Sequence, residues 1–236
     1  AVVLFLPVVF LNSAVWAQCD SIYTSFCVMS FYFLLRGRGR LSMALYGVAF
    51  SFKLQAVFFA PAAVVFFLKG RLKFSDLLFF VLAYFLCALP AVIAGMSLVD
   101  ALFGAYLIQT NEYDRITLNA PNLYQFLSDS YNVSPELGNM LVFFAFGVCA
   151  IFCTYFYRAD YRLDDKGMLL IAYLFSVLLP FVLPHMHERY FYMADIFAVI
   201  FTFVYPKKAY ISAATAYCSL RAVVMFLFDG SGTKGS

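Results

Sequence analysis

The chain has 236 residues, of which 64% are hydrophobic and only 12% are charged, and its mean hydropathy is +0.87. Soluble domains are about 45–50% apolar and about 25% charged, so this composition excludes a soluble globular protein and indicates a polytopic membrane protein. The formal net charge is only +3. Because the basic residues occur in short loops, we interpret them as determinants of membrane topology and not as a surface for nucleic acid.

The six cysteines show neither metal-site nor disulfide spacing, and five of them lie in apolar runs, where cysteine acts as a small hydrophobic residue. Redox chemistry is therefore not expected. The chain starts inside an apolar stretch without the features of a signal peptide, which we interpret as the interior of a longer, N-terminally truncated protein. The Gly- and Ser-rich end, 229–236, has the composition of a flexible tail.

Apolar stretches alternate with short polar breaks along the whole chain, and a helix needs about 20 apolar residues to cross a bilayer. In chain order the predicted membrane segments are 1–16, 21–35, 41–68, 74–95, 138–157, 167–183, 190–205 and 209–228. We therefore predict an all-α fold, a polytopic transmembrane helix bundle that forms one domain over 1–228.

The breaks carry most of the basic residues. Three Lys or Arg occur in each of the loops 36–40, 69–73 and 158–166, and two occur at 207–208. The positive-inside rule places all four loops in the cytoplasm. A single crossing by 41–68 would separate two of them, so we predict a re-entrant helical hairpin with Lys53 near its tip, which is tolerated where it lines a cavity. The alternative is one tilted helix over 41–68 with a snorkelling Lys53.

This topology places three polar segments on the extracytoplasmic face: residues 16–20, a long loop over about 96–136, and residues 184–189. A loop of about 40 residues is usually functional or disordered. Its part 97–108 has helical apolar spacing and is expected to lie in the membrane interface. Its part 120–126 contains aromatic and amide groups of the kind that stack on sugars, although for any one of these residues we favour a plain surface loop.

Both histidines of the chain belong to the run Pro184–Tyr190, together with Glu188 and Arg189. The spacing of His185 and His187 differs from that of zinc metalloproteases, so metal binding is a minor alternative. A guanidinium binds phosphate bidentately, and Arg189 lies where a helix is predicted to begin, so we expect an anion site. His187 would add a hydrogen bond or proton, and Glu188 would orient a neighbour. The alternative is an ion cluster that anchors a helix end.

Two further polar groups accompany this motif. Trp16, Gln18 and Asp20 lie on the same predicted face and could hold sugar hydroxyls, although an N-cap role explains Asp20 as well. Lys53 and Gln55 lie at the tip of the predicted hairpin, where a lysine needs a carboxylate or phosphate partner. We call His185–Arg189 the His–Arg motif, and we expect Lys53, Asp20 and this motif to gather around one anionic headgroup.

These stretches resemble a known family. Asn12–Tyr23 is similar to the Trp-Gly-Gln-x-Asp-Ser-x-Tyr stretch of bacterial mannosyltransferase-like proteins, with Ala17 in place of the usual Gly. Gly47–Pro61 is similar to a Lys-Gln-rich segment of the dolichyl-phosphate-glucose glucosyltransferases, and His185–Arg189 is similar to their His-x-His-Glu-Lys motif, with Arg for Lys. Over most of 1–205 the chain thus resembles the GT-C superfamily of polytopic membrane glycosyltransferases, and the His-x-His-Glu motif is the most specific part.

The resemblance implies inverting transfer of a hexose from a polyprenyl- or dolichyl-phosphate-linked donor to a glycan or lipid-linked acceptor. The reaction would occur on the extracytoplasmic face, in a bacterial inner membrane rather than the endoplasmic reticulum. The implied donor-phosphate residues are His185, His187, Glu188, Arg189 and Lys53. The implied sugar or acceptor residues are Trp16, Gln18, Asp20 and Gln55.

The family's general base, usually an Asp in the first large extracytoplasmic loop, does not map onto this chain. Asp20 does not match it by position, so the base is expected upstream of Ala1 and the fragment alone is expected to be inactive. No cofactor is expected, with a divalent cation as the alternative. Two other classes of function stay open at this point, namely a membrane transporter or lipid flippase and a non-catalytic membrane scaffold.

Overall fold

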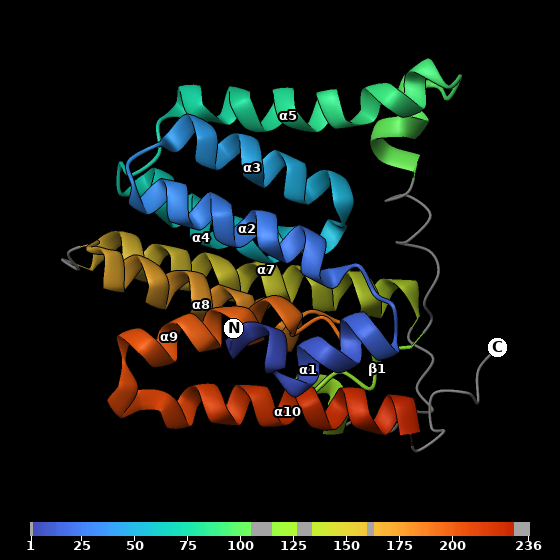
Figure 1. Cartoon of the computed structure of the whole chain (residues 1–236), viewed down its shortest axis with the longest axis vertical. Coiled ribbons are helices and arrows are strands. Elements are labelled where there is room, and N and C mark those ends of the chain that lie inside the picture. Colours follow the sequence, from blue (N-terminus) through green and yellow to red (C-terminus); the bar gives the residue numbers. More distant parts are fainter. Residues whose placement is uncertain (1, 105–114, 127–133, 160–162, 229–236) are drawn as a thin grey trace. The chain divides into compact units, whose positions relative to one another are not determined.

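The computed structural model describes residues 2–104, 115–126, 134–159 and 163–228. These residues are almost entirely helical (Figure 1), which confirms the predicted all-α class for the described part of the chain. The chain divides into two compact units. We call residues 1–21 with 114–236 the terminal unit, and residues 22–113 the middle unit. The predicted tail, 229–236, lies outside the described residues, as do 105–114 and 127–133 of the predicted long loop.

The elements follow one another along the chain as η1 (Val2–Phe5), α1 (Pro7–Phe10), η2 (Leu11–Val15), α2 (Asp20–Leu35), α3 (Gly39–Phe52), η3 (Leu54–Phe59), α4 (Ala60–Leu68), α5 (Phe74–Ile93), η4 (Asp100–Gly104), β1 (Thr117–Leu118), η5 (Leu123–Phe126), α7 (Pro135–Arg158), α8 (Asp165–Val182), β2 (Met186–His187), α9 (Tyr192–Val204), η6 (Pro206–Lys208) and α10 (Ala209–Phe228). The predicted single span over 1–16 is wrong, because Leu6 is extended (ψ 129°). A residue before proline avoids the helical region, and Pro7 follows Leu6.

Four of the described helical segments are long and apolar enough to cross a membrane: Phe74–Ile93, Pro135–Arg158, Asp165–Val182 and Pro206–Phe228. The 20 residues of α5 make a helix about 30 Å long, which matches the hydrocarbon thickness of a bilayer. The length and composition of these four helices indicate a multi-pass membrane protein. Several other apolar helices are shorter, such as α2 and α9.

In the middle unit the chain reverses direction after α3. Lys53 is extended (φ −159°, ψ 135°) and ends α3, so the alternative of one continuous helix over 41–68 is wrong. Gly39 at the start of α3 packs on Asp76 at the start of α5, and Gly47 packs on Phe80 further along. The two helices therefore run parallel, and η3 with α4 forms the return path between them (Figure 1). The depth of this reversal in a bilayer stays a prediction.

Aromatic rings fill the space between the helices of the middle unit. The ring of Phe59 lies 5.4 Å from that of Tyr46 and 6.4 Å from that of Phe31, in edge-to-face geometry in both pairs. Phe80 reaches the same cluster from α5, with its centroid 5.2 Å from Tyr46. Edge-to-face pairs add about 0.5–1.5 kcal/mol each beyond area burial. The many phenylalanines of the sequence thus provide the packing of the α3–η3 reversal.

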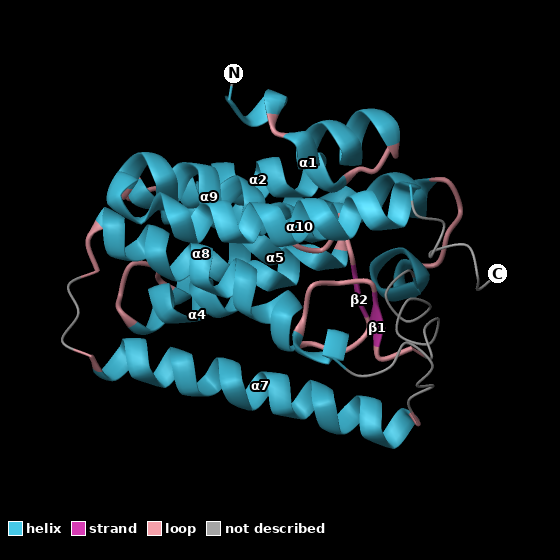
Figure 2. Cartoon of the chain, turned by 90° about the horizontal axis from the view of Figure 1, so that it is seen from below, coloured by secondary structure: helices cyan, strands magenta, loops and turns pink. Residues whose placement is uncertain are grey.

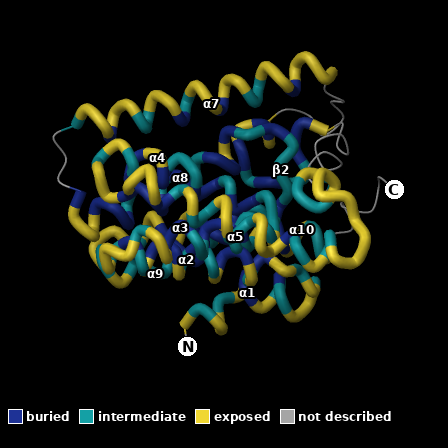
Figure 3. The backbone as a smooth tube through the Cα atoms, turned by 90° about the horizontal axis from the view of Figure 1, so that it is seen from above, coloured by how far each residue is buried: buried dark blue, intermediate teal, exposed yellow. Residues whose placement is uncertain are grey.

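In the terminal unit α8 and α9 form the buried core, and α9 also packs on α10. The long helix α7 is exposed along most of its length (Figure 3). At one end of α8 the chain becomes extended, and β2 pairs in parallel with β1 from the long loop (Figure 2). This short pairing positions the His–Arg motif, and it was not predicted from the sequence.

The close approach of α3 to α5 leads to a first prediction. An added methyl group at Gly47 would collide with the backbone carbonyl of Phe80, whereas one at Gly147 in α7 meets nothing within 4 Å. We expect Gly47→Ala to destabilise the protein by about 1–3 kcal/mol, because a backbone must move. Gly147→Ala should be neutral or stabilise by up to about 1 kcal/mol through helix propensity. Thermal unfolding of both variants in the same detergent measures the difference, and equal effects would contradict this packing.

Candidate functional site

The N-terminal part of the site is a tight turn that follows η2. Ala17 has φ +56°, which is the left-handed region. The N–H of Gln18 donates a hydrogen bond to the carbonyl oxygen of Asn12 at 3.0 Å. This reversal brings Asp20 back to Asn12, whose Nδ2 donates to Asp20 Oδ2 at 2.9 Å. Both side chains are fully buried. The predicted N-cap position of Asp20 is close to the structure, where it is the first residue of α2, but its carboxylate is also the acceptor for a buried amide.

The His–Arg motif begins as an extended segment and ends as a turn. His185 N–H donates to Ile116 O at 2.8 Å, and Glu188 N–H donates to Leu118 O at 3.1 Å. The N–H of Tyr190 then donates a hydrogen bond to His187 O at 3.1 Å, which closes a turn. Helix α9 starts only at Tyr192, two residues later than predicted. The pairing with the loop keeps the first part of the motif out of helical geometry.

A second set of contacts fastens the long loop to the end of α8. Tyr124 Oη donates to Val182 O at 2.8 Å, and Asn122 Nδ2 lies 3.5 Å from Leu183 O. Both side chains are buried. Burial raises the pKa of the Tyr124 phenol above its ordinary value, so it stays a donor at neutral pH. Asn122 and Tyr124, which belong to the segment that the sequence suggested for sugar contacts, cap the open carbonyls where α8 ends.

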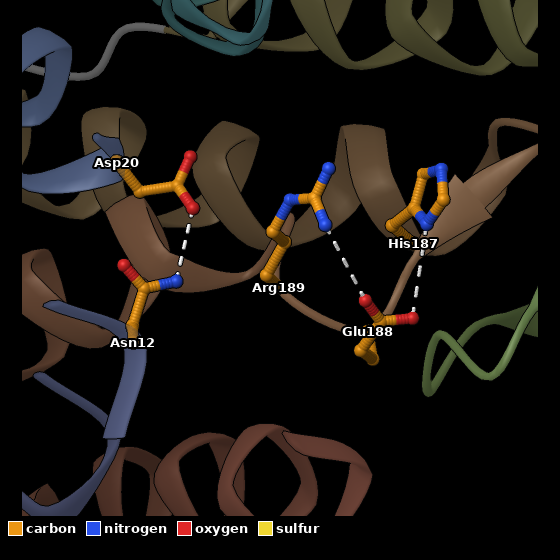
Figure 4. A network of polar contacts seen from close by, with 5 residues as sticks. All are labelled: Asn12, Asp20, His187, Glu188 and Arg189. Atoms are coloured by element: carbon orange, nitrogen blue, oxygen red, sulfur yellow. Dashed lines mark hydrogen bonds and ion pairs between the residues drawn. The ribbon is translucent and has the colours of Figure 1, made fainter. Parts of the chain in front are cut away.

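The core of the site is a buried carboxylate between two basic groups (Figure 4). Glu188 is only 1% exposed, and its Oε2 lies 3.8 Å from His187 Nδ1 while its Oε1 lies 3.7 Å from Arg189 Nη1. Both distances fit ion pairs and exceed hydrogen-bond length. Among the described residues, Glu188 Oε1 and Arg189 Nε have no hydrogen-bond partner. The site therefore holds buried polar atoms whose hydrogen-bonding capacity is not used by the described residues.

Arg189 is also fixed by aromatic rings. Its Cζ lies 5.1 Å from the centroid of the Trp16 ring and 5.8 Å from that of Tyr190. Trp16 is itself stacked on Phe226 of α10 at 4.5 Å. Cation–π contacts contribute about 0.5–2 kcal/mol and leave the guanidinium donors unused. Trp16, predicted as a sugar or acceptor contact, thus positions Arg189.

The charges of this cluster set a condition on its ligand. Figure 4 shows Arg189 between Asp20 on one side and Glu188 on the other. Two carboxylates outweigh one guanidinium, so a phosphate is attracted only if a further cation contributes, from His187 or from elsewhere. A fixed guanidinium with unused donors can still bind an anion bidentately once that charge is supplied.

The remaining predicted residues are placed as follows. His185 Nδ1 lies 2.6 Å from Arg115 O, and its Nε2 faces Gly138 of α7, so its ring is held by the loop. Gln18 is half-buried next to the Ala17 turn. Lys53 and Gln55 belong to the middle unit, where Gln55 is buried and its Oε1 has no described hydrogen-bond partner. Their gathering around one headgroup with the His–Arg motif stays a prediction.

Backbone strain is concentrated in this region. Ala17, Asn119 and His185 are the described non-glycine residues with positive φ, at 56°, 57° and 59°. All three adjoin the turn, the loop strand or the His–Arg motif. Such residues cost about 1–3 kcal/mol each and cluster at functional sites. Within the described residues, no group of three or more His, Cys, Asp or Glu side chains could hold a metal ion.

Sequence reasoning missed Asn12, and it missed the contacts of Asn122 and Tyr124 with the end of α8. A lone amide in the apolar run of Asn12 was the available signal, since such a group needs a partner in a membrane protein. Nothing local indicates that Tyr124 reaches the end of α8. Comparison with models of known families, with curated proteins and with solved structures found no match.

The strained turn gives a second prediction. Ala17→Gly should stabilise the protein by roughly 0.5–1 kcal/mol, because glycine adopts positive φ without the steric cost, and this gain exceeds its larger entropy in the unfolded chain. Ala14→Gly is the matched control, since Ala14 lies in η2 and glycine there should destabilise by about 1 kcal/mol. Thermal unfolding of both variants in one detergent shows whether their stabilities change in opposite directions. A loss of stability in Ala17→Gly would contradict the strained turn.

Proposed function

We propose that the chain forms the donor-binding part of a membrane glycosyltransferase of the GT-C type, which transfers a hexose from a polyprenyl- or dolichyl-phosphate-linked donor on the extracytoplasmic face. The proposal rests first on the resemblance of three segments to that superfamily. The observation that carries it further is the state of Arg189, which is fixed by Trp16 and Glu188 while its Nε keeps an unused donor. A positioned guanidinium suits a phosphate leaving group.

In the proposed reaction an acceptor hydroxyl oxygen bonds to the anomeric carbon of the hexose. The bond from that carbon to the lipid phosphate breaks, and the phosphate leaves with the electron pair. The acceptor proton passes to a general base, which is not assigned to a residue of this chain. Negative charge grows on the departing phosphate, and fixed cations lower the energy of that transition state more than that of the bound donor.

The residues of the cluster would have different roles in this reaction. Arg189 would hold the phosphate, and His187 would donate a hydrogen bond to it. Glu188 and Trp16 would position Arg189, since both contact the guanidinium. Because Asp20 and Glu188 carry two negative charges, we propose that Lys53 supplies the additional cation. Gln18, Gln55 and Asp20 would contact sugar or acceptor hydroxyls.

Lys53 can reach the extracytoplasmic face only if the reversal between α3 and α4 enters and leaves the membrane on one side, as a re-entrant hairpin. This part of the proposal is supported by the parallel course of α3 and α5, which brings the loops at 36–38 and 69–73 to the same end of the middle unit. Neither α3, with 14 residues, nor α4, with 9, has the length of about 20 residues that a full crossing needs.

Labelling of single cysteines tests the hairpin. In a variant without the six native cysteines, Arg38→Cys, Arg71→Cys and Lys207→Cys should all resist a membrane-impermeant maleimide in intact cells and react after permeabilisation. Phe126→Cys should react in intact cells. All four native residues are exposed, so access is limited by the membrane alone. Opposite sidedness of positions 38 and 71 would eliminate the re-entrant hairpin.

Substitution of the two cations tests the reaction. In the full-length protein we expect Arg189→Ala and Lys53→Gln to lower transfer from a polyprenyl-phosphate sugar by about 10²–10³-fold, because each removes a charge that stabilises the leaving phosphate. Arg189→Lys should recover only part of the loss, since an ammonium is not bidentate. Turnover is measured with a radiolabelled donor and normalised to the amount of folded protein.

Arg36→Ala is the control, because Arg36 is an exposed arginine of the loop after α2. It should leave turnover within about twofold of the unmodified protein, in line with small effects at exposed sites. Normal transfer by folded Arg189→Ala would argue strongly against a donor-phosphate role. Normal transfer by Lys53→Gln alone would remove Lys53 from the site and leave Arg189 in place.

A further inference from the structure

A cavity in the terminal unit lies apart from the residues that the proposed function uses. Its volume is about 380 Å³, within the range of about 300–1,000 Å³ that is usual for small-molecule sites. One face of α9, one face of α10 and the short helices η1 and α1 form its walls. The lining residues are Val2, Leu6, Pro7, Val8, Asp195, Ala198, Val199, Thr202, Phe203, Ala209, Ser212, Ala213, Ala216 and Leu220.

The cavity is elongated along the α9–α10 pair. On α9 its lining runs from Asp195 in the first turn to Phe203 near the end, which corresponds to about 12 Å of helix. Val2 and Phe203 are 52% and 70% exposed, so an apolar rim leads into the cavity from the protein surface. A hydrocarbon chain matches both the shape and the rim.

The polar atoms of the walls are not equivalent. Thr202 Oγ1 and Ser212 Oγ both donate to Ala198 O at 2.9 Å, so both hydroxyl protons are used within the protein. Asp195 is only 2% exposed. Its Oδ2 accepts a hydrogen bond from Ser219 Oγ at 2.6 Å, while its Oδ1 has no hydrogen-bond partner among the described residues. A buried carboxyl oxygen without a partner is costly and is usually explained by a ligand or water.

We propose that this cavity binds a single-chain amphiphile whose polar end carries an O–H or N–H donor. The donor would bind Asp195 Oδ1, and the apolar chain would lie along α9 toward Phe203. A lipid alcohol and a lipid amine share this chemistry. Lipids whose polar end offers only hydrogen-bond acceptors do not fit, because Asp195 Oδ1 needs a donor. The site is therefore different from the proposed donor-phosphate site around Arg189.

Photo-crosslinking of defined probes tests the proposal on the full-length protein in phosphatidylcholine nanodiscs. The probes are 1-decanol, decylamine, decanoic acid and decane, each with a diazirine at the far end of the chain. We expect decanol or decylamine to label α9 at 199–203 and α10 at 209–216, and the stronger of the two identifies the head chemistry. Decane and decanoic acid should label these segments at least about tenfold less, the difference that one hydrogen bond to a carboxyl group makes.

Three variants separate the cavity from unspecific membrane contact. Asp195→Asn keeps the shape of the side chain and should lower labelling by decylamine about tenfold. Ala216→Leu fills the cavity and should abolish labelling by every probe. Ala214→Leu changes a residue of the same helix outside the lining and should leave labelling unchanged.

Equal labelling by all four probes would overturn the proposal, and so would labelling that survives Ala216→Leu or is absent altogether. If Asp195→Asn fails to fold, the comparison of decane with decanol and decylamine still decides the role of the head group. Because none of these measurements uses sugar transfer, their failure and the failure of the proposed glycosyltransferase activity can be told apart.

Discussion

The burial of one carboxylate organises the polar end of the terminal unit. Glu188 is 1% exposed, and a carboxylate removed from water needs cations close by. The chain supplies them from its two neighbours, His187 and Arg189. His187, Glu188 and Arg189 are consecutive residues, so their side chains meet here through an extended segment followed by a turn and not through a helix. The pairing of β1 with β2 creates that condition, because it keeps the motif extended before the turn that leads into α9.

The buried charge cluster also involves the N-terminal part of the chain, through the contact between Arg189 and Trp16. Arg189 cannot satisfy its guanidinium on Glu188 alone at 3.7 Å, and the ring of Trp16 provides its second contact. Trp16 is held in turn by Phe226 and by the turn at Ala17. A strained backbone persists where surrounding contacts outweigh its cost. The Asn12–Asp20 hydrogen bond and the Trp16 stack are such contacts, so strain and charge burial are parts of one arrangement.

In the middle unit, close helix packing has the organising role. Gly39 and Gly47 remove side chains from the face of α3 that meets α5, and small residues allow helices in membranes to approach closely. Two parallel helices that are near neighbours in the chain need a return segment between them. The extended Lys53 and the short helix η3 begin that segment, and the hydrogen bond from Tyr46 Oη to Ala56 O at 3.1 Å fastens it. Lys53 thus belongs to the return segment that the parallel packing of α3 and α5 requires.

The amino-acid sequence by itself determined the all-α class, the positions of most helices and the polar segments in which the candidate site lies. It did so because apolar run length and charge act locally along the chain. Tertiary structure alone decided that Ala17 is left-handed, that Tyr124 caps the end of α8, that Trp16 holds Arg189, and that Asp195 faces a cavity. The turn at Ala17 is closed by contacts of Asn12 with Gln18 and Asp20, and the other three depend on residues far apart in the sequence. All four follow from packing and from the need to satisfy buried polar groups, which no local pattern encodes.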